Sequence, residues 1–170
     1  MGAATMIAEG SPIAVDDDGV DLTIRRALED DQLAITGMVR RARLNPAHHD
    51  WDRFVIAVLD RRTVGAGQLR LHSDNSLELA SLVVEPDARG LGIASRIVEA
   101  LLADERCQVH TLIDRRYVDH FARWGFVRVD PSLLPRSVHR TYRIGRVVTA
   151  VGSLLRRRRI RLVPLVRAAR

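Results

Sequence analysis

The chain contains no lysine, although it carries 27 arginines among its 170 residues. A nucleotide-triphosphate loop ends in Gly-Lys-Ser or Gly-Lys-Thr, so the missing lysine excludes this class of phosphate-binding motif. The use of arginine at every position where lysine could stand indicates a compositional bias more than a functional choice, although guanidinium groups suit two-point contacts with phosphate.

Cysteine and long apolar runs are equally scarce. The single cysteine, Cys107, cannot form a disulfide within the chain. No apolar stretch approaches the ~18 residues of a membrane span, and no cleavable signal pattern is present. These absences predict a soluble cytoplasmic protein.

Aromatic residues make up 4% of the chain, and its histidines do not form a metal motif. Trp51 and Trp124 are far apart in the sequence and offer no platform for stacking bases. The adjacent His48 and His49 have no cysteine or carboxylate at metal-ligand spacing, so no metal site is expected. Three single histidines are expected in structural or surface roles: His72, His110 and His139.

Acidic residues are absent from the C-terminal end. Residues 131–170 carry 11 arginines and no acid, whereas residues 1–130 carry 16 arginines against 21 acids. The C-terminal segment could therefore meet nucleic acid, an anionic membrane, an acidic substrate or the phosphates of a cofactor. Arginine runs are most often solvated, and the sequence gives no strong case for a nucleic-acid or membrane partner.

The strongest positive signal lies between Ser81 and Leu102, where an apolar strand leads through a glycine turn into an amphipathic helix. Pro86 ends the strand because it has no backbone N–H to donate. Gly90 and Gly92 permit a tight turn and let a ligand approach N–H groups at the positive end of the helix dipole. The helix has a buried side at Ile93, Ala94, Ile97, Val98, Leu101 and Leu102. This order predicts a phosphate-binding strand, loop and helix.

Two other interpretations of the glycine turn stay open. A Gly-x-Gly pair between a strand and a helix also occurs in tight turns that bind no ligand. A dinucleotide-binding turn would have glycine at Ser95 and would have no residues like Pro86 to Arg89 between the strand and the first glycine. Asp114 does lie about 20 residues on, as that motif requires, so this interpretation is weakened and not eliminated.

The length of the chain fits a single domain with its own core. Residues 1–20 predict a disordered lead, and residues 21–170 a single domain with an arginine-rich helix and strand over about 137–170. Strands are expected at 21–27, 54–59, 63–71, 77–84, 108–113, 126–130 and 160–166. Helices are expected from 29 to the break at Asn45-Pro46, from 93, at 116–124, and from 137 to about 157. Pro164 implies that the last strand is an edge or contains a bulge.

Three antiparallel strands are followed by Val84-x-Pro86-x-x-Arg89-Gly90-x-Gly92-Ile93-Ala94 and later by Trp124-Gly125-Phe126. This order resembles the GNAT superfamily of acyl-CoA-dependent N-acetyltransferases, well over residues 21–130 and more loosely beyond. The resemblance implies an α/β (α+β) fold with a mixed, mostly antiparallel sheet of six to seven strands, splayed between strands 4 and 5, and helices on both faces. The helix inserted before the last strand is similar to the arrangement in a bacterial branch of the superfamily, whose members acetylate small molecules or amino acids.

The resemblance also implies where acetyl-CoA binds. Its pantetheine amides would pair with the main chain of Leu82, Val83 and Val84 in the fourth strand. Its pyrophosphate would lie on the glycine turn and helix start, at Arg89, Gly90, Leu91, Gly92, Ile93, Ala94 and Ser95. The chain itself agrees, because a pyrophosphate matches a row of N–H groups at a helix start.

Acyl transfer to an amine needs a base for the ammonium, a positioned nucleophile and a proton for the departing thiolate. Glu78 aligns with the glutamate that is the general base in some members of the superfamily; the alternative is an outward-facing strand glutamate. The N–H of Val83 would stabilise the oxyanion. At the usual position of the thiol-protonating tyrosine this chain has Phe121, so Tyr117, one helical turn earlier, or His120 would substitute.

We therefore expect an N-acetyltransferase that moves an acetyl group from acetyl-CoA to a primary amine of a small metabolite or amino acid in a ternary complex. If the arginine-rich end borders the acceptor site, an acidic acceptor is favoured over a polyamine. The alternative is a CoA-binding sensor or interaction protein, with weak or no catalysis, that docks on an anionic partner through Arg156–Arg161. The acceptor amine and the oligomeric state, a homodimer included, stay open.

Overall fold

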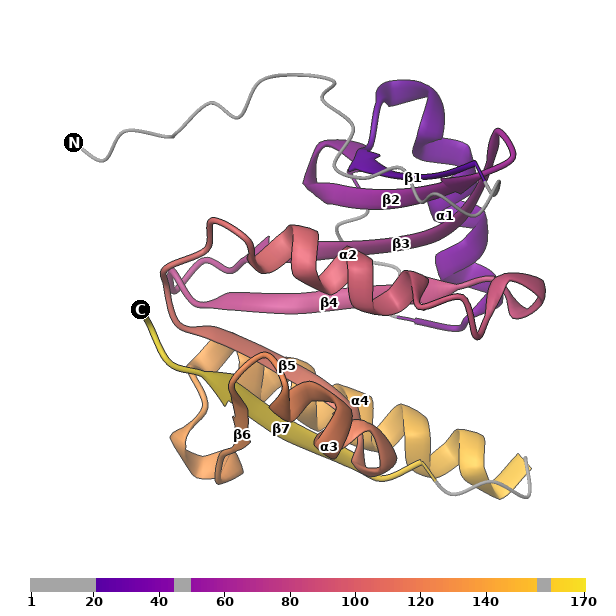
Figure 1. Ribbon diagram of the computed structural model, residues 1–170. Coiled ribbons are helices and arrows are strands. Elements are labelled where there is room, and N and C mark those ends of the chain that lie inside the picture. The colour runs from indigo at the N-terminus through magenta and orange to yellow at the C-terminus, as the bar shows by residue number, and fades with distance from the viewer. Residues whose placement is uncertain (1–20, 45–49, 156–159) are drawn as a thin grey trace. The chain divides into compact units, whose positions relative to one another are not determined.

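The computed structural model describes residues 21–44, 50–155 and 160–170 (Figure 1). The expected disordered lead, the histidines at 48 and 49, and residues 156–159 of the arginine run lie outside these ranges. The chain divides into two compact units. The first unit comprises Met1–Gln68 and Ser81–Ala103, and the second comprises Leu69–Ala80 and Asp104–Arg170.

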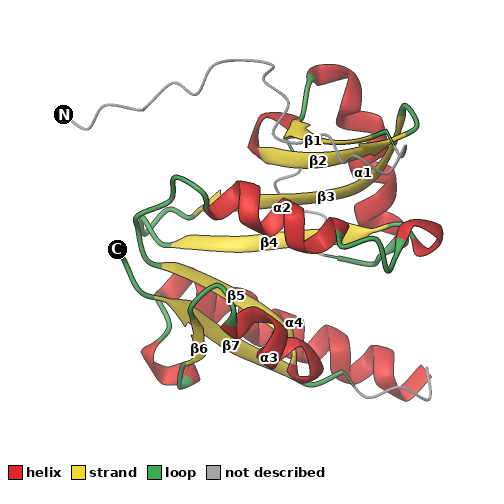
Figure 2. Ribbon diagram, viewed as in Figure 1, coloured by secondary structure: helices red, strands yellow, loops and turns green. Residues whose placement is uncertain are grey.

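Within the described residues, seven strands form one sheet in the order β1-β2-β3-β4-β5-β7-β6 (Figure 2). They are β1 (Leu22–Arg26), β2 (Phe54–Leu59), β3 (Arg62–Leu71), β4 (Leu77–Val84), β5 (Val109–Asp114), β6 (Phe126–Arg128) and β7 (Leu162–Arg167). The β1-β2, β2-β3, β5-β7 and β6-β7 pairs are antiparallel, whereas β4 and β5 pair in parallel through Leu77–Leu79 and Val109–Thr111. The predicted mixed, mostly antiparallel sheet is confirmed.

Four α-helices of the described chain follow the predicted order: α1 (Gln32–Arg41), α2 (Ile93–Leu102), α3 (Val118–Ala122) and α4 (Arg136–Leu155). The helix expected from residue 29 begins at Gln32, because the acidic residues Glu29–Asp31 form a 3-10 turn directly before it. None of the helices in the described ranges is long and apolar enough to cross a membrane.

In the first unit, α1 and α2 cover opposite faces of the strands. Successive residues of a strand point to opposite faces. Val55 of β2 belongs to a core cluster with Ile97 of α2, and the next residue, Ile56, belongs to a cluster with Ile35 of α1. Gly65 of β3 permits the close approach of α2, because a Cβ there would lie 2.9 Å from Ile97 Cδ1.

In the second unit, α4 packs on β5 and β7 through a face that the apolar pattern of the sequence did not predict. Leu134, Val138 and Tyr142 are buried in one cluster, with Leu112 and Leu162 packed against it. The sequence pattern that predicts this helix places Ile144, Val147 and Val148 on one side of it, and these residues are 53%, 65% and 57% exposed. The helix is confirmed, and its outer face is partly apolar.

The edge position expected for the last strand is wrong, because β7 lies between β5 and β6. Pro164 pairs with Leu112 of β5, one residue beyond the last β6 pair, Arg128 with Leu165. The Pro164 carbonyl accepts a hydrogen bond from the N–H of Val129 at 3.2 Å. The proline is thus tolerated in an inner strand at the point where the short β6 has ended.

Candidate functional site

The glycine turn before α2 has the backbone conformation that its sequence predicts. Gly90 has φ +90° and Gly92 has φ +73°, a region that residues with a side chain rarely adopt. A Cβ built on either glycine would meet no atom within 4 Å. The two glycines are therefore required by backbone conformation and not by packing, and the space beside them is open.

The turn is anchored at both ends and exposed between them. Ala88 and Ile93 are buried in the same core cluster of the first unit, whereas residues 89–92 are exposed. Helix α2 begins directly after Gly92 without a side-chain cap. A helix start of this kind, with the positive end of its dipole at an exposed turn, is suited to binding an anion.

The acids beside the turn are neutralised by arginines. Glu85 pairs with Arg41 of α1 at 2.5 Å, and Asp87 pairs with Arg62 of β3 at 2.6 Å. Arg89 Nε donates to the Val84 carbonyl at 3.2 Å, which ties this exposed side chain to the end of β4. An anion at the turn would consequently meet paired carboxylates, which weakens their repulsion.

The C-terminal part of β4 contains the three residues that the resemblance assigns to pantetheine. Leu82 and Val84 pack against the α2 cluster and Val83 against the α1 cluster, as strand alternation requires. Just before them, Ser81 has φ +54°, and its hydroxyl accepts a hydrogen bond from Gln68 Nε2 at 3.1 Å. This left-handed residue interrupts the regular strand between Glu78 and Leu82.

Glu78 lies in the second unit and is buried, with 3% of its surface exposed. The alternative of an outward-facing strand glutamate is therefore wrong. His72 Nε2 lies 2.7 Å from Glu78 Oε2, a hydrogen-bond distance. His110 of β5 is the partner of Glu78 in the parallel register and is also buried. The sequence pattern predicts separate structural or surface roles for His72 and His110, whereas the structure places both beside Glu78, the candidate base.

The surroundings of His110 favour its neutral form. Burial lowers the pKa of His110, and the nearby carboxylates of Glu78 and Asp74 oppose that shift. One ring nitrogen, Nε2, lies 3.2 Å from Gln108 Oε1. The other, Nδ1, is buried and has no hydrogen-bond partner within the described part of the chain.

Asp74, in the turn between β3 and β4, ties this cluster to α4. Its carboxylate accepts hydrogen bonds from the Ser76 hydroxyl at 2.6 Å and from the Ser137 N–H, in the first turn of α4, at 2.9 Å. The Ser76 hydroxyl and then the Ser137 N–H hold the pKa of Asp74 far below its usual range. Asp74 therefore acts as an N-terminal cap for α4 from a distant part of the sequence.

The candidates for the thiol-protonating group lie around α3 in the second unit. Tyr117 is 50% exposed, with the Arg116 guanidinium 5.1 Å from its ring centroid. Phe121 is buried and packs edge-to-face on Trp124 and Phe126. Phe121 therefore packs against its aromatic neighbours. Tyr117, which is half exposed, remains the candidate for protonating the thiolate.

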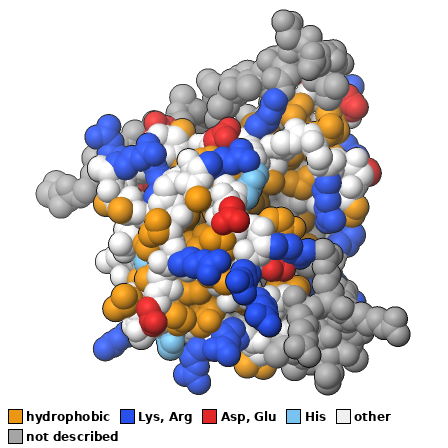
Figure 3. Space-filling view, turned by 60° about the horizontal axis from the view of Figure 1, so that its bottom comes forward, with side chains coloured by type: hydrophobic (Ala, Val, Ile, Leu, Met, Phe, Trp, Pro, Cys, Tyr) orange, Lys and Arg blue, Asp and Glu red, His pale blue; other side chains and the backbone are white. Residues whose placement is uncertain are grey.

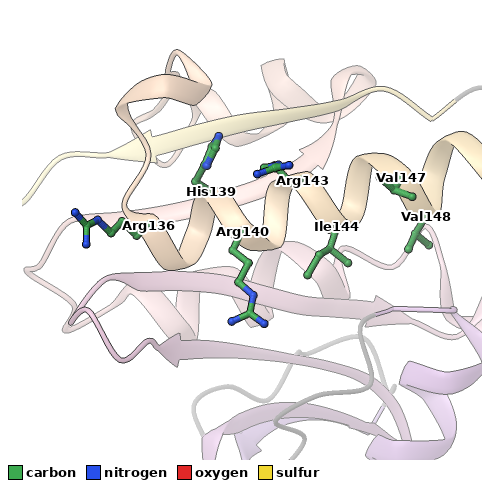
Figure 4. Close-up of a pocket in the computed structure, with 7 residues that line it drawn as sticks. All are labelled: Arg136, His139, Arg140, Arg143, Ile144, Val147 and Val148. Atoms are coloured by element: carbon green, nitrogen blue, oxygen red, sulfur yellow. The ribbon is translucent and has the colours of Figure 1, made fainter.

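A groove runs along one face of α4, where the basic side chains of its first turns are followed by aliphatic ones (Figure 4). It is lined by Arg136, His139, Arg140, Arg143, Ile144, Val147 and Val148. Figure 3 shows arginine and apolar side chains intermixed on the face that it presents.

Within the described ranges, no group of three histidine, cysteine, aspartate or glutamate side chains is placed to hold a metal ion.

The fold and the glycine turn define a mixed α/β protein with an exposed, uncapped helix start after its fourth strand. A family model described as an acetyltransferase (GNAT) domain matches residues 50–128. This part of the chain, which includes Glu78 and the glycine turn, is similar to GNAT acetyltransferase domains. A search of the curated proteins found no match.

Solved structures show the same fold at low sequence identity. N-acetylglutamate synthase from Neisseria gonorrhoeae, complexed with coenzyme A and N-acetyl-glutamate, is 21% identical with a TM-score of 0.65 over 88% of this chain. Rv2747 from Mycobacterium tuberculosis, in complex with CoA and NLQ, is 23% identical with a TM-score of 0.63, and the match covers 86% of this chain and 99% of that one. The chain spans only 35% of the N-acetylglutamate synthase chain.

Ard1 from Thermoplasma volcanium also shares the fold. It is 13% identical with a TM-score of 0.59, and the match covers 88% of this chain and 98% of that one. Identities this low relate the folds and not the substrates.

Proposed function

We propose that this chain is an N-acetyltransferase that moves an acetyl group from acetyl-CoA to a primary amine of a small metabolite or amino acid. The observation that carries the proposal is the open glycine turn at the start of α2, within the segment that matches the GNAT domain. Two of the similar structures were solved with coenzyme A, which supports an acyl-CoA donor. In this proposal residues 21–170 work as one acetyltransferase domain.

The pyrophosphate of the donor would bind to main-chain N–H groups between Arg89 and Ser95. The space that a Cβ would take at Gly90 or Gly92 is open, so phosphate oxygens can approach the backbone there. The pantetheine arm would follow the main chain of Leu82, Val83 and Val84 in β4. Such a site uses backbone groups and positive charge, which are the features that a diphosphate requires.

In the proposed reaction, Glu78 removes a proton from the acceptor ammonium, and the free amine attacks the thioester carbonyl carbon. The N–H of Val83 stabilises the oxyanion that forms, and collapse of the intermediate releases the thiolate of CoA. Tyr117 is the proposed donor of the proton that the thiolate takes up. The nitrogen of the new amide loses its second proton as the intermediate collapses, and a proton carried by solvent restores the tyrosine. Holding the two substrates together can contribute ~7 to 11 kcal/mol, so the reaction does not depend on Tyr117 alone.

We propose an acceptor that carries a carboxylate, as an amino acid does. The N-acetylglutamate synthase structure contains N-acetyl-glutamate, and the arginine side chains of the α4 groove favour an anion over a polyamine. A panel of amino acids, dicarboxylic amines and polyamines, assayed for CoA release, separates these classes. Turnover restricted to polyamines would contradict this acceptor.

The cofactor site is tested by calorimetric titration of acetyl-CoA into Gly92→Glu. The new side chain would occupy the open space beside the turn and place a carboxylate where the diphosphate binds, so we expect no measurable affinity. Gly125→Ala is the matched control, because Gly125 also has a positive φ, +81°, but lies in the second unit. Unchanged affinity in Gly92→Glu would refute the site.

The second candidate function is a CoA-binding interaction protein that docks on an anionic partner. It is favoured by the α4 groove, where three arginines border exposed aliphatic side chains. Removing the C-terminus is a poor test, since it would delete the inner strand β7. Arg140→Glu with Arg143→Glu should instead abolish low-salt binding to anionic vesicles or nucleic acid; equal binding by both proteins would exclude this role.

A further inference from the structure

Glu78 presents a chemical difficulty that follows from its burial. A general base must lose its proton after each turnover, and water is the final acceptor of that proton. The Glu78 side chain is only 4% exposed, so direct exchange with solvent is restricted. A group beside it that reaches the surface would complete the catalytic cycle.

His72 is placed to do this. Its Nε2 lies 2.7 Å from Glu78 Oε2, and its side chain is 12% exposed, three times the fraction of Glu78. An imidazole can accept a proton on one nitrogen while it releases another from the second nitrogen. We propose that His72 is a positioning and relay residue, which orients the Glu78 carboxylate and passes its proton to solvent.

The backbone around His72 is held on both sides. The His72 N–H donates to the Ser76 carbonyl at 2.9 Å, and the His72 carbonyl accepts from the Asn75 N–H at 3.0 Å. Asp74 in turn binds Ser76 and the start of α4. The imidazole is therefore presented to Glu78 by a closed turn and not by a free loop, which lowers the entropy cost of holding the pair.

Other charged and titratable groups also face Glu78. His110 lies beside it on β5, and burial lowers the pKa of His110, so this ring stays neutral near pH 7. In regular antiparallel pairing, the His72–Ser76 bond places the buried Arg70 of β3 across from Glu78. His72 combines a hydrogen-bond distance to the Glu78 carboxylate with a side chain that is partly exposed.

The proton balance of the relay is simple. The acceptor ammonium gives one proton to a Glu78 oxygen, and the amine lone pair then forms the new C–N bond. Glu78 passes this proton to His72 Nε2 while His72 Nδ1 releases one to water. No oxidant, reductant or metal takes part. The relay leaves the imidazole protonated on Nε2, and a half-turn of the ring then presents the free nitrogen to Glu78 and restores the starting state of the pair. This proposal rests on the proposed acetyltransferase function.

The test compares His72→Ala, His72→Gln and Glu78→Gln in steady-state assays with acetyl-CoA and an accepted amine. We expect kcat of His72→Ala to fall by about 10²-fold, the lower end of the usual contribution of acid–base catalysis. Added imidazole should restore part of the lost rate. His72→Gln, which keeps a hydrogen-bond donor but cannot relay a proton, should stay slow without imidazole.

Glu78→Gln is the matched control for rescue, because imidazole cannot replace the primary base and should leave its rate low. Calorimetry should give each variant the acetyl-CoA affinity of the parent protein, since the glycine turn belongs to the other unit. A parental kcat in His72→Ala, or a loss that imidazole does not restore, would overturn the relay. No turnover by the parent protein with any amine would instead refute the proposed function, and the relay with it.

Discussion

The two compact units of this chain build their candidate sites from different groups: main chain in the first unit and a buried side chain in the second. In the first unit, the candidate anion site consists of main chain at an exposed turn, and no side chain caps the helix that follows. In the second unit, the candidate base is a buried side chain whose geometry depends on neighbouring strands. A backbone site can be found from glycine positions, whereas a buried side-chain site depends on which strands pair.

The most severe test of this division is to damage one site and measure the other. Glu78→Gln should lower kcat by ~10² to 10⁴-fold, because a carboxamide cannot take a proton. Its affinity for acetyl-CoA should stay at the parental value, in contrast to the loss expected for Gly92→Glu. Rates and calorimetry on the same preparations check both. Weakened acetyl-CoA binding in Glu78→Gln would show that the two functions are not separable.

Gly65→Val tests how α2 is held against the first unit. A Cβ at this position would lie 2.9 Å from side-chain atoms of both Ile93 and Ile97. Overpacking of this kind costs about 1–3 kcal/mol of unfolding free energy, and we expect a weaker acetyl-CoA site as α2 shifts. Denaturant unfolding and calorimetry measure the two effects.

Gly37→Ala in α1 is the control for Gly65→Val. Its Cβ would meet only the flexible guanidinium of Arg41, at 3.0 Å. Helix propensity favours alanine over glycine by up to about 1 kcal/mol, so stability should rise or stay level. A parental unfolding free energy in Gly65→Val would mean that α2 is not tightly packed on β3.

Asp74→Ala probes the second unit with a smaller expected effect. Loss of the hydrogen bond to Ser137 uncaps α4, and caps contribute ~1 kcal/mol to stability. Asp130→Ala is a close control, because Asp130 makes the same two bonds to a serine two residues on but none to α4. Urea unfolding should show the larger loss for Asp74→Ala; equal losses would exclude the capping role.

The smallest expected effect is a pH dependence of stability that comes from His110. Burial lowers the pKa of His110 in the folded protein, so below about pH 6.5 the unfolded chain binds more protons than the folded one. The contribution is full above that pH and is lost as the pH falls toward the folded value. Between pH 7 and 5, His110→Asn should therefore lose less stability than the parent protein; an identical slope would contradict this.

The local elements were predictable because they depend on neighbouring residues. The predicted strand at 77–84 coincides with β4, and the predicted start of the next helix coincides with Ile93. The apolar pattern of α4 was visible too, but Val138 and Tyr142 form its buried face while Ile144 and Val147 stay exposed. A helix with apolar residues on two sides does not reveal in sequence which side meets the sheet.

The histidines near Glu78 could have been suspected only in part. His72 and Glu78 flank the turn around Asp74, and antiparallel strands joined by such a turn bring their side chains together. His110 lies 32 residues beyond Glu78, and its position follows from the parallel β4-β5 register. No local pattern carries that information.

The amino-acid sequence by itself determined the glycine turn, because only residues without a Cβ readily take its positive φ angles next to a helix start. Tertiary structure alone decided that Glu78 is buried between two histidines and that β7 is an inner strand. The physical reason is range: backbone conformation is set within a few residues, whereas burial and register are set by strands that meet from distant parts of the chain.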